Sequence, residues 1–264
     1  MSLAALLFDV DGTLADTEET HRQAFNATFA EAGLPFAWDA VVYERLLQVT
    51  GGKERLAHFF DSQSLSSEEK ARLLTRVPEL HRAKNRKYAE LVSKRGAPLR
   101  PGIARLLGEA EAAGIRLGIA TTTSPENVLS LLEAELGAGA DTRFAVIASG
   151  DMVRAKKPAP DIYDLALSRL DLSPDRVIAF EDSQSGLSSA KSAGIFTVVT
   201  PNRWTQAQDF ARADLIVPHL GDPLHPLDAD ASARARGPYL TLETLVAMHA
   251  RASARSSRRR DVAP

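Results

Sequence analysis

Hydrophobic and polar positions divide the chain into segments of two kinds. From residue 96 to residue 217, short apolar runs alternate with segments in which apolar residues recur at helical spacing, and residues 3–10 form one more dense apolar run. Such continuous apolar runs are typical of strands buried on both faces of a parallel sheet, with helices connecting them. The pattern therefore predicts an α/β fold with a doubly wound parallel sheet.

The predicted elements of this core follow one another with short loops. Strands are expected at residues 3–10, 115–120, 144–148, 177–180, 195–199 and 215–217. Helices are expected between them, at residues 102–113, 125–136, 160–170 and 185–193. Gly114 marks the end of the first of these helices, as glycine commonly does. The expected architecture is a Rossmann-like core.

A long block after the first strand has a different pattern. Residues 17–95 contain no strand-like run, and their apolar residues recur at helical spacing. The pattern predicts helices at residues 17–32, 39–48, from 51 onward and from 66 onward. Pro78 is expected to break or kink the last of these, because proline lacks the N–H that a helix interior needs. We therefore predict an all-helical cap, residues 16–95, inserted into a core of residues 1–15 and 96–220.

The remaining residues, 221–264, form a C-terminal extension. Residues 221–236 are rich in Asp, Pro and Ala, and residues 239–249 have the pattern of a helix. Residues 250–264 hold five arginines and almost no apolar residue. That composition is typical of a solvated, disordered tail. A tail that contacts RNA or a membrane is the alternative.

Composition excludes several classes of function. None of the 264 residues is cysteine, which excludes disulfides, thiolate catalysis and cysteine-ligated metal sites. The net charge of -2 provides no general basic field for nucleic acid or an anionic membrane. No stretch approaches about 18 apolar residues, and the first ten residues do not resemble a signal peptide. We therefore expect a cytoplasmic protein that binds neither nucleic acid nor membrane, and we take a monomer as the default.

Two acidic residues end the first predicted strand. In Asp9-Val10-Asp11-Gly12-Thr13, strand alternation points both carboxylates the same way. Carboxylates this close repel each other unless a cation or a shared proton holds them. Gly12 allows the chain to turn sharply after them. Many such pairs are ordinary turns or caps, so the pair alone does not define a site.

Hydroxyl residues follow the second predicted strand. In doubly wound sheets, ligands bind beyond the carboxyl ends of the strands, so polar residues there are candidates for a common site. Thr121-Thr122-Thr123-Ser124 precedes a predicted helix whose first turns include Asn127. Hydroxyls and free N–H groups at a helix start can bind phosphate. Ser124 before Pro125 also fits an ordinary helix cap, and both roles are compatible.

Charged residues follow the third and fourth predicted strands. Lys156-Lys157 precedes a proline, and a lysine at this edge can neutralise a phosphate. An exposed lysine pair is the alternative. Glu181-Asp182 ends the fourth strand, where adjacent acids suit Mg²⁺. The alternative is that these acids only favour the start of the next helix.

These four segments resemble, in order, the motifs of phosphatases in the haloacid dehalogenase superfamily, over roughly residues 3 to 217. The superfamily pattern begins with DxDGT directly after the first strand. The resemblance implies that Asp9 is a covalent nucleophile against phosphorus. It also implies that Asp11 protonates the leaving oxygen and then deprotonates the water that hydrolyses the aspartyl-phosphate.

The same resemblance implies the remaining roles at the strand ends. Thr121 and Lys157 bind the phosphate oxygens, since the pattern places its lysine directly before proline. Mg²⁺ is the expected cofactor, held by Asp9, Asp182 and the backbone carbonyl of Asp11. Glu181 is expected to be a further ligand through a water molecule.

Substrate specificity is expected to come from the cap. Glu18 and His21 are three residues apart, on one helix face toward the site, although His21 also fits an ordinary hinge histidine. In Thr50-Gly51-Gly52-Lys53-Glu54-Arg55, glycines and cations suit a second anion. A helix–helix turn with solvated charges is the alternative. The segment His81-Arg82-Ala83-Lys84 is expected on a solvated helix face.

Two sets of anion-binding groups predict a substrate with two anionic ends. Residues 15–26, with the Thr50–Arg55 segment and the strand-end motifs, resemble the CbbY-type phosphatases of Calvin-cycle bacteria. That resemblance implies hydrolysis of xylulose-1,5-bisphosphate, an inhibitor of Rubisco. Three alternatives stay open: a phosphatase for phosphoglycolate or another sugar phosphate, a phosphotransferase similar to β-phosphoglucomutase, and a regulator that binds a phosphometabolite without turning it over.

Overall fold

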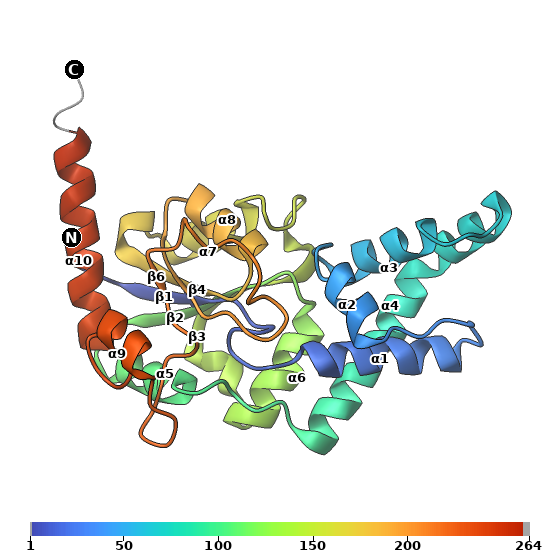
Figure 1. Ribbon diagram of the computed structural model, residues 1–264, viewed down its shortest axis with the longest axis horizontal. Coiled ribbons are helices and arrows are strands. Elements are labelled where there is room, and N and C mark those ends of the chain that lie inside the picture. Colours follow the sequence, from blue (N-terminus) through green and yellow to red (C-terminus); the bar gives the residue numbers. More distant parts are fainter. Residues whose placement is uncertain (1, 261–264) are drawn as a thin grey trace.

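A parallel sheet forms the centre of the molecule. The computed structural model describes residues 2–260 (Figure 1). The sheet order is β3-β2-β1-β4-β5-β6, and all paired strands are parallel. The strands are β1 (Ala5–Phe8), β2 (Arg116–Ala120), β3 (Phe144–Ala148), β4 (Val177–Glu181), β5 (Phe196–Val199) and β6 (Leu215–Ile216). The predicted α/β fold with a doubly wound sheet is therefore confirmed.

Helices cover both faces of this sheet. They are α5 (Ile103–Ala112), α6 (Pro125–Leu136), α7 (Asp161–Leu170) and α8 (Gln184–Ser192), with short 3₁₀ turns η1 (Ala140–Arg143), η2 (Gly150–Met152) and η3 (Pro174–Arg176). Leu6 and Phe8 of β1 pack in one core cluster with α5 and α6, whereas Ala5 and Leu7 pack in a second with α7 and α8. Alternate side chains of the strand are thus buried on opposite faces, which explains its unbroken apolar run.

Four helices lie beyond one end of the sheet (Figure 1). They are α1 (Glu18–Glu31), α2 (Ala40–Leu46), α3 (Gly52–Asp61) and α4 (Ser67–Arg95). An aromatic cluster around Phe29, Trp38 and Phe59 forms their own core, separate from the clusters of the sheet. The observation fits the predicted division into a core (1–15 and 96–220) and a cap (16–95), which we retain as a proposal.

Pro78 was predicted to break or kink the last of these helices. A break is wrong, since α4 runs without interruption through Pro78. Proline costs one backbone hydrogen bond inside a helix. Val77 and Leu80 on either side are buried in the aromatic cluster. Burial of such side chains contributes roughly 1.5–3 kcal/mol each, which offsets that loss. Ser66 and Glu69 add a reciprocal capping box at the helix start.

The C-terminal extension is packed against the core rather than separate from it. Helix α9 (Ala229–Ala235) and helix α10 (Leu242–Arg260) follow the sheet. Leu227, Leu240 and Leu245 are buried in the same cluster as α5. The prediction of a disordered tail is wrong for residues 250–260, whose backbone continues α10, while residues 261–264 lie outside the described residues. Alanine and arginine are strong helix formers, and cations are favoured at a helix C-terminus.

None of the helices described here has both the length and the apolar character needed to cross a membrane.

Candidate active site

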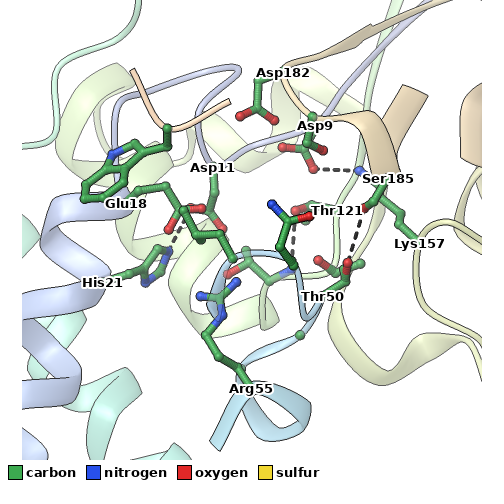
Figure 2. A pocket seen from close by; sticks show the side chains of 18 of the residues that line it. Asp9, Asp11, Glu18, His21, Thr50, Arg55, Thr121, Lys157, Asp182 and Ser185 are labelled. Atoms are coloured by element: carbon green, nitrogen blue, oxygen red, sulfur yellow. Dashed lines mark hydrogen bonds and ion pairs between the residues drawn. The ribbon is translucent and has the colours of Figure 1, made fainter. Parts of the chain in front are cut away.

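The strand ends and the cap enclose one large cavity, about 500 Å³ in volume. Figure 2 shows Asp9 and Asp182 on one side of it and Arg55 on the opposite side. The structure brings most of the predicted site residues to its walls: Asp9, Asp11, Glu18, His21, Thr50, Gly51, Gly52, Arg55, Thr121, Thr122, Thr123, Asn127, Lys157 and Asp182. Glu181 lies directly behind this wall, fully buried.

Lys53, also predicted to bind substrate, lies outside this cavity. Its ammonium pairs with Asp151 of the core at the partly exposed edge of the protein. The two cations of the Thr50–Arg55 segment therefore point to different places. Arg55 lines the cavity, and its guanidinium donates to the Tyr43 hydroxyl at 3.0 Å and to the Leu46 carbonyl at 3.1 Å.

Lys157 lies between two carboxylates at the ends of β1 and β4. Its Nζ is 2.7 Å from Asp9 Oδ1 and 2.6 Å from Glu181 Oε1. Tyr163 of α7, a residue that the sequence analysis did not single out, donates its hydroxyl to the same Glu181 oxygen at 2.6 Å. Lys157, Glu181 and Tyr163 are all buried, so the lysine is fixed in direction toward Asp9.

Burial governs the ionisation of the predicted nucleophile. It raises the pKa of Asp9 to about 7, and the nearby Glu181 charge adds to this, whereas the Lys157 ammonium opposes it. Burial also disfavours the charged form of Lys157, but Asp9 and Glu181 outweigh that effect and raise the pKa of Lys157 above its usual range. The lysine therefore stays charged, and its charge favours the ionised form of Asp9, the form that a nucleophile needs.

Three buried carboxylates at this end can hold a metal ion. Ligand oxygens of Asp9, Glu181 and Asp182 lie within 4.8 Å of one another. Glu181 Oε2 receives no hydrogen bond from any described residue, and a Cβ at Gly186 would lie 1.9 Å from it. Hard oxygen ligands with an unpartnered buried carboxylate oxygen fit a cation such as Mg²⁺. The Asp11 carboxylate is not in this group, and a contribution of the Asp11 backbone carbonyl stays a prediction.

The Asp11 carboxylate points toward the cap instead. Its Oδ1 accepts a hydrogen bond from Thr17 Oγ1 at 2.6 Å. It accepts a second one from His21 Nε2 at 2.8 Å (Figure 2). His21 Nδ1 lies 2.7 Å from Lys84 Nζ, so a His21 protonated on Nε2 satisfies both contacts. Burial alone would raise the pKa of Asp11, but His21 and Thr17 outweigh it and hold that pKa well below its usual range. Asp11 is thus a carboxylate in this conformation.

Lys84 corrects the expectation of a solvated face for residues 81–84. Its side chain is buried, 3% exposed, and its ammonium lies over the rings of Phe25 and Tyr88. Burial lowers the pKa of Lys84 to about 7, against the attraction of Asp11. A lysine on an amphipathic helix usually extends into water. Only the fold shows that this one extends inward to His21.

The hydroxyl segment begins helix α6, as predicted. Thr121 is buried, and its Oγ1 accepts from the Thr123 N–H at 3.3 Å. Ser124 occupies the N-cap position, but its hydroxyl makes no capping bond and instead accepts from Asn85 of α4 at 2.9 Å. Asn127 donates to the same Asn85 at 3.1 Å. The free N–H groups of this helix start therefore remain available to an anion in the cavity.

The cap wall is organised around one tyrosine that the sequence analysis missed. Tyr43 is fully buried, and its hydroxyl donates to Glu18 at 2.7 Å while accepting from Arg55. Thr50 Oγ1 lies 3.2 Å from Ser185 Oγ of the core, so the cap touches the core across the cavity. Glu18, Thr50 and Arg55 thus face the strand ends from fixed positions.

Comparisons with known proteins agree with this geometry. A family profile described as haloacid dehalogenase-like hydrolase matches residues 3–194. The plasmid-borne CbbY protein of Cupriavidus necator is 51% identical over 225 residues, covering 85% of this chain and 89% of that protein. The β-phosphoglucomutase of Bacillus subtilis is 33% identical over 224 residues, covering 83% of this chain and 91% of that protein.

A solved structure provides the comparison at atomic level. The crystal structure of a CbbY point variant from Rhodobacter sphaeroides, in complex with xylulose-1,5-bisphosphate, has a TM-score of 0.76 and 47% sequence identity. It covers 82% of this chain and 94% of that chain. The predicted family and the predicted class of enzyme, a phosphatase, are confirmed. By the matching profile, the relatives and the shared fold, the chain belongs to the haloacid dehalogenase-like hydrolases.

Proposed function

We propose that this hydrolase is a Mg²⁺-dependent phosphatase that converts xylulose-1,5-bisphosphate to xylulose 5-phosphate. The observation that carries the proposal is one cavity with a cationic side chain on each of two opposite walls. Asp9, Lys157 and Asp182 lie at one wall, and Arg55 lies at the other. Gly51 and Gly52, at the start of the helix that holds Arg55, also line the cavity. A substrate with a phosphate at each end matches both. The solved relative that binds this bisphosphate supports the choice.

The reaction begins at Asp9. Its carboxylate attacks phosphorus and displaces the sugar oxygen, which forms an aspartyl-phosphate and releases the sugar. Lys157 and the start of α6 at Thr121 bind the phosphate oxygens, where negative charge develops. Mg²⁺, when held by Asp9, Asp182 and the Asp11 carbonyl, supplies positive charge that offsets the charges of phosphate and nucleophile.

In the conformation seen here, Asp11 is suited to act as the base in the second step, the hydrolysis of the aspartyl-phosphate. As a carboxylate held by Thr17 and His21, it can accept a proton from the water that hydrolyses the aspartyl-phosphate. The first step requires it to give a proton to the leaving sugar oxygen. That role requires Asp11 to release at least one of these two hydrogen bonds, because they stabilise the ionised form.

A phosphate-release screen tests the proposal. We expect the purified protein to release phosphate from xylulose-1,5-bisphosphate with the highest kcat/KM among sugar mono- and bisphosphates and phosphoglycolate. EDTA is expected to abolish the activity, and excess Mg²⁺ to restore it. A preference for phosphoglycolate or a monophosphate, or full activity in EDTA, contradicts the proposal.

The β-phosphoglucomutase relative supports a second candidate, transfer of the phosphoryl group to a sugar instead of water. The two activities share Asp9 and differ in what reacts with the aspartyl-phosphate. Incubation with β-glucose 1-phosphate and a bisphosphate primer distinguishes them. A phosphatase releases inorganic phosphate, whereas a mutase forms glucose 6-phosphate without net phosphate release. We also propose that the protein is a monomer and that it works in the cytoplasm.

Arg55 is expected to recognise the far phosphate. Charge-assisted hydrogen bonds contribute about 1.5–3 kcal/mol, so Arg55→Ala is expected to raise KM for the bisphosphate about 10- to 100-fold. KM for a monophosphate such as xylulose 1-phosphate is expected to change little. Lys53→Ala is a matched control, because this cation of the same segment lies outside the cavity. Equal effects of Arg55→Ala on both substrates, or of both variants on the bisphosphate, contradict the assignment.

A further inference from the structure

Arg100 is a buried arginine at the point where the chain returns from the cap to the core. Only 8% of it is exposed. The preceding residue, Leu99, bridges to Ala15 of the outgoing connection, and the Arg100 N–H donates to the Leu14 carbonyl at 2.8 Å. Its side-chain Nε lies 3.4 Å from Asp16 Oδ1. Arg100, which lies on the returning connection, thus also contacts the outgoing one.

The guanidinium of Arg100 continues from there into the core. It donates to the carbonyls of Gly12, Thr200, Pro201 and Pro218, of which the last three are at 2.6, 3.0 and 2.8 Å. Carbonyls satisfy the buried donors but do not neutralise the charge. A rigid, planar set of five donors is what allows a single side chain to reach four separate carbonyls.

Three of these carbonyls, those of Gly12, Thr200 and Pro201, belong to two segments that pack on Asp182. Asn202, two residues beyond Thr200, donates its Nδ2 to Asp182 Oδ2 at 2.7 Å and to the Gly12 carbonyl at 3.4 Å. The Thr200 N–H donates to the Glu181 carbonyl at 2.8 Å. Gly12, with a φ of +84°, approaches so closely that a Cβ there would lie 2.4 Å from Asp182 Oδ2.

We propose that Arg100 is a positioning residue for Asp182: it clamps Gly12 and the 200–202 loop together, so that Asn202 presents the Asp182 carboxylate to the metal in one orientation. The inference rests on the metal site of the proposed function. Since Arg100 also lies on one connection to the cap and contacts the other, the orientation of Asp182 is tied to the base of the cap. Residues behind metal ligands commonly affect affinity about 10- to 100-fold.

Metal binding itself tests the proposal, without turnover. Binding of Mn²⁺, as a paramagnetic substitute for Mg²⁺, is measured by the loss of the free-ion EPR signal. Arg100→Gln is expected to weaken Mn²⁺ binding at least about tenfold. Arg105→Gln is the matched control, since Arg105 is also partly buried and donates to the carbonyls of Leu220, Gly221 and Leu240. The hydrogen bond to Asp182 comes instead from Asn202. The Mn²⁺ affinity of Arg105→Gln is expected to stay within about twofold of the wild type.

A double-variant cycle tests the route of the effect. Asn202→Ala removes the hydrogen bond that Asn202 donates to Asp182. Asn202 is only half-buried, so the substitution leaves no closed cavity. If Arg100 acts through Asn202, the double variant binds Mn²⁺ no more weakly than the weaker single variant. Two losses that multiply would show independent effects and overturn the proposed link. If Arg100→Gln does not fold, Arg100→Lys takes its place, because one ammonium cannot reach four carbonyls.

Asp182→Asn separates failure of this inference from failure of the proposed function. A folded Arg100→Gln protein that binds Mn²⁺ as tightly as the wild type overturns the role of Arg100. In that case a loss of Mn²⁺ binding in Asp182→Asn leaves the metal site and the phosphatase proposal standing. Unchanged Mn²⁺ binding in Asp182→Asn would remove the metal site, and both proposals with it.

Discussion

Asp9→Asn is expected to lower kcat for phosphate release by at least about 10⁴-fold, because an amide cannot attack phosphorus to form the aspartyl-phosphate. The substitution preserves the shape of the side chain. Lys157 keeps its pairing with Glu181 at 2.6 Å, so the buried lysine is not left without a counter-charge. Substrate binding is therefore expected to survive while turnover is lost. Phosphate release under saturating substrate measures the effect.

Stability is the control for this variant. The folded state raises the pKa of Asp9 from 3.8 to about 7, so it binds the proton more tightly than the unfolded chain does. In metal-free protein this contribution to stability is present at low pH and is lost as pH rises toward and through 7. Asparagine carries no charge, so at pH 8 in EDTA the Tm of Asp9→Asn is expected to equal or exceed that of the wild type. Retention of more than about 1% of wild-type kcat in the folded variant would remove Asp9 as the nucleophile.

The residues at the strand ends could be predicted because each depends on local order in the sequence. Apolar runs located the strands, and parallel strands end at one edge of the sheet. Any polar residue directly after such a run therefore had to lie near the others. Asp9, Thr121, Lys157 and Asp182 follow four different strands, and the structure brings all four to one cavity.

Contacts between distant side chains could not be predicted in this way. Lys84 and His21 are 63 positions apart, and Tyr163 and Glu181 are 18 apart. A lysine on a long helix has the same pattern whether it extends into water or turns inward. Nothing in a single sequence pairs Asn202 with Asp182, because that contact exists only after β5 is placed beside β4.

The two wrong predictions about helices have a common cause. Pro78 was expected to break or kink a helix, and the residues after 250 were expected to be disordered because they hold almost no apolar residue. Both expectations weighed one local property alone. In the structure, burial around Pro78 and the helix propensity of alanine and arginine outweigh it. A helix therefore forms around Pro78 in spite of the proline, and another forms at residues 250–260 in spite of their polar composition.

The second large effect is expected at Asp11. A positioned acid or base contributes about 10²- to 10⁴-fold, so Asp11→Asn is expected to lower kcat on sugar phosphates by that amount. With p-nitrophenyl phosphate, whose leaving group needs no proton, only hydrolysis of the aspartyl-phosphate still requires the Asp11 base. We therefore expect a burst of p-nitrophenol, about one equivalent per site, followed by slow turnover.

The pH dependence makes that experiment specific to Asp11. Thr17 and His21 hold the pKa of Asp11 well below its usual range, so its base form persists at pH 5. The factor between the rates at which the wild type and Asp11→Asn hydrolyse the aspartyl-phosphate, measured once this intermediate has formed, is thus expected to stay constant from pH 5 to pH 8. Asp9→Asn serves as the control and shows no burst, since it forms no intermediate. Equal rates of aspartyl-phosphate hydrolysis in the two proteins, or a factor between these rates that collapses toward pH 5, would show that another group accepts the proton, because a carboxylate with a depressed pKa remains ionised across that range.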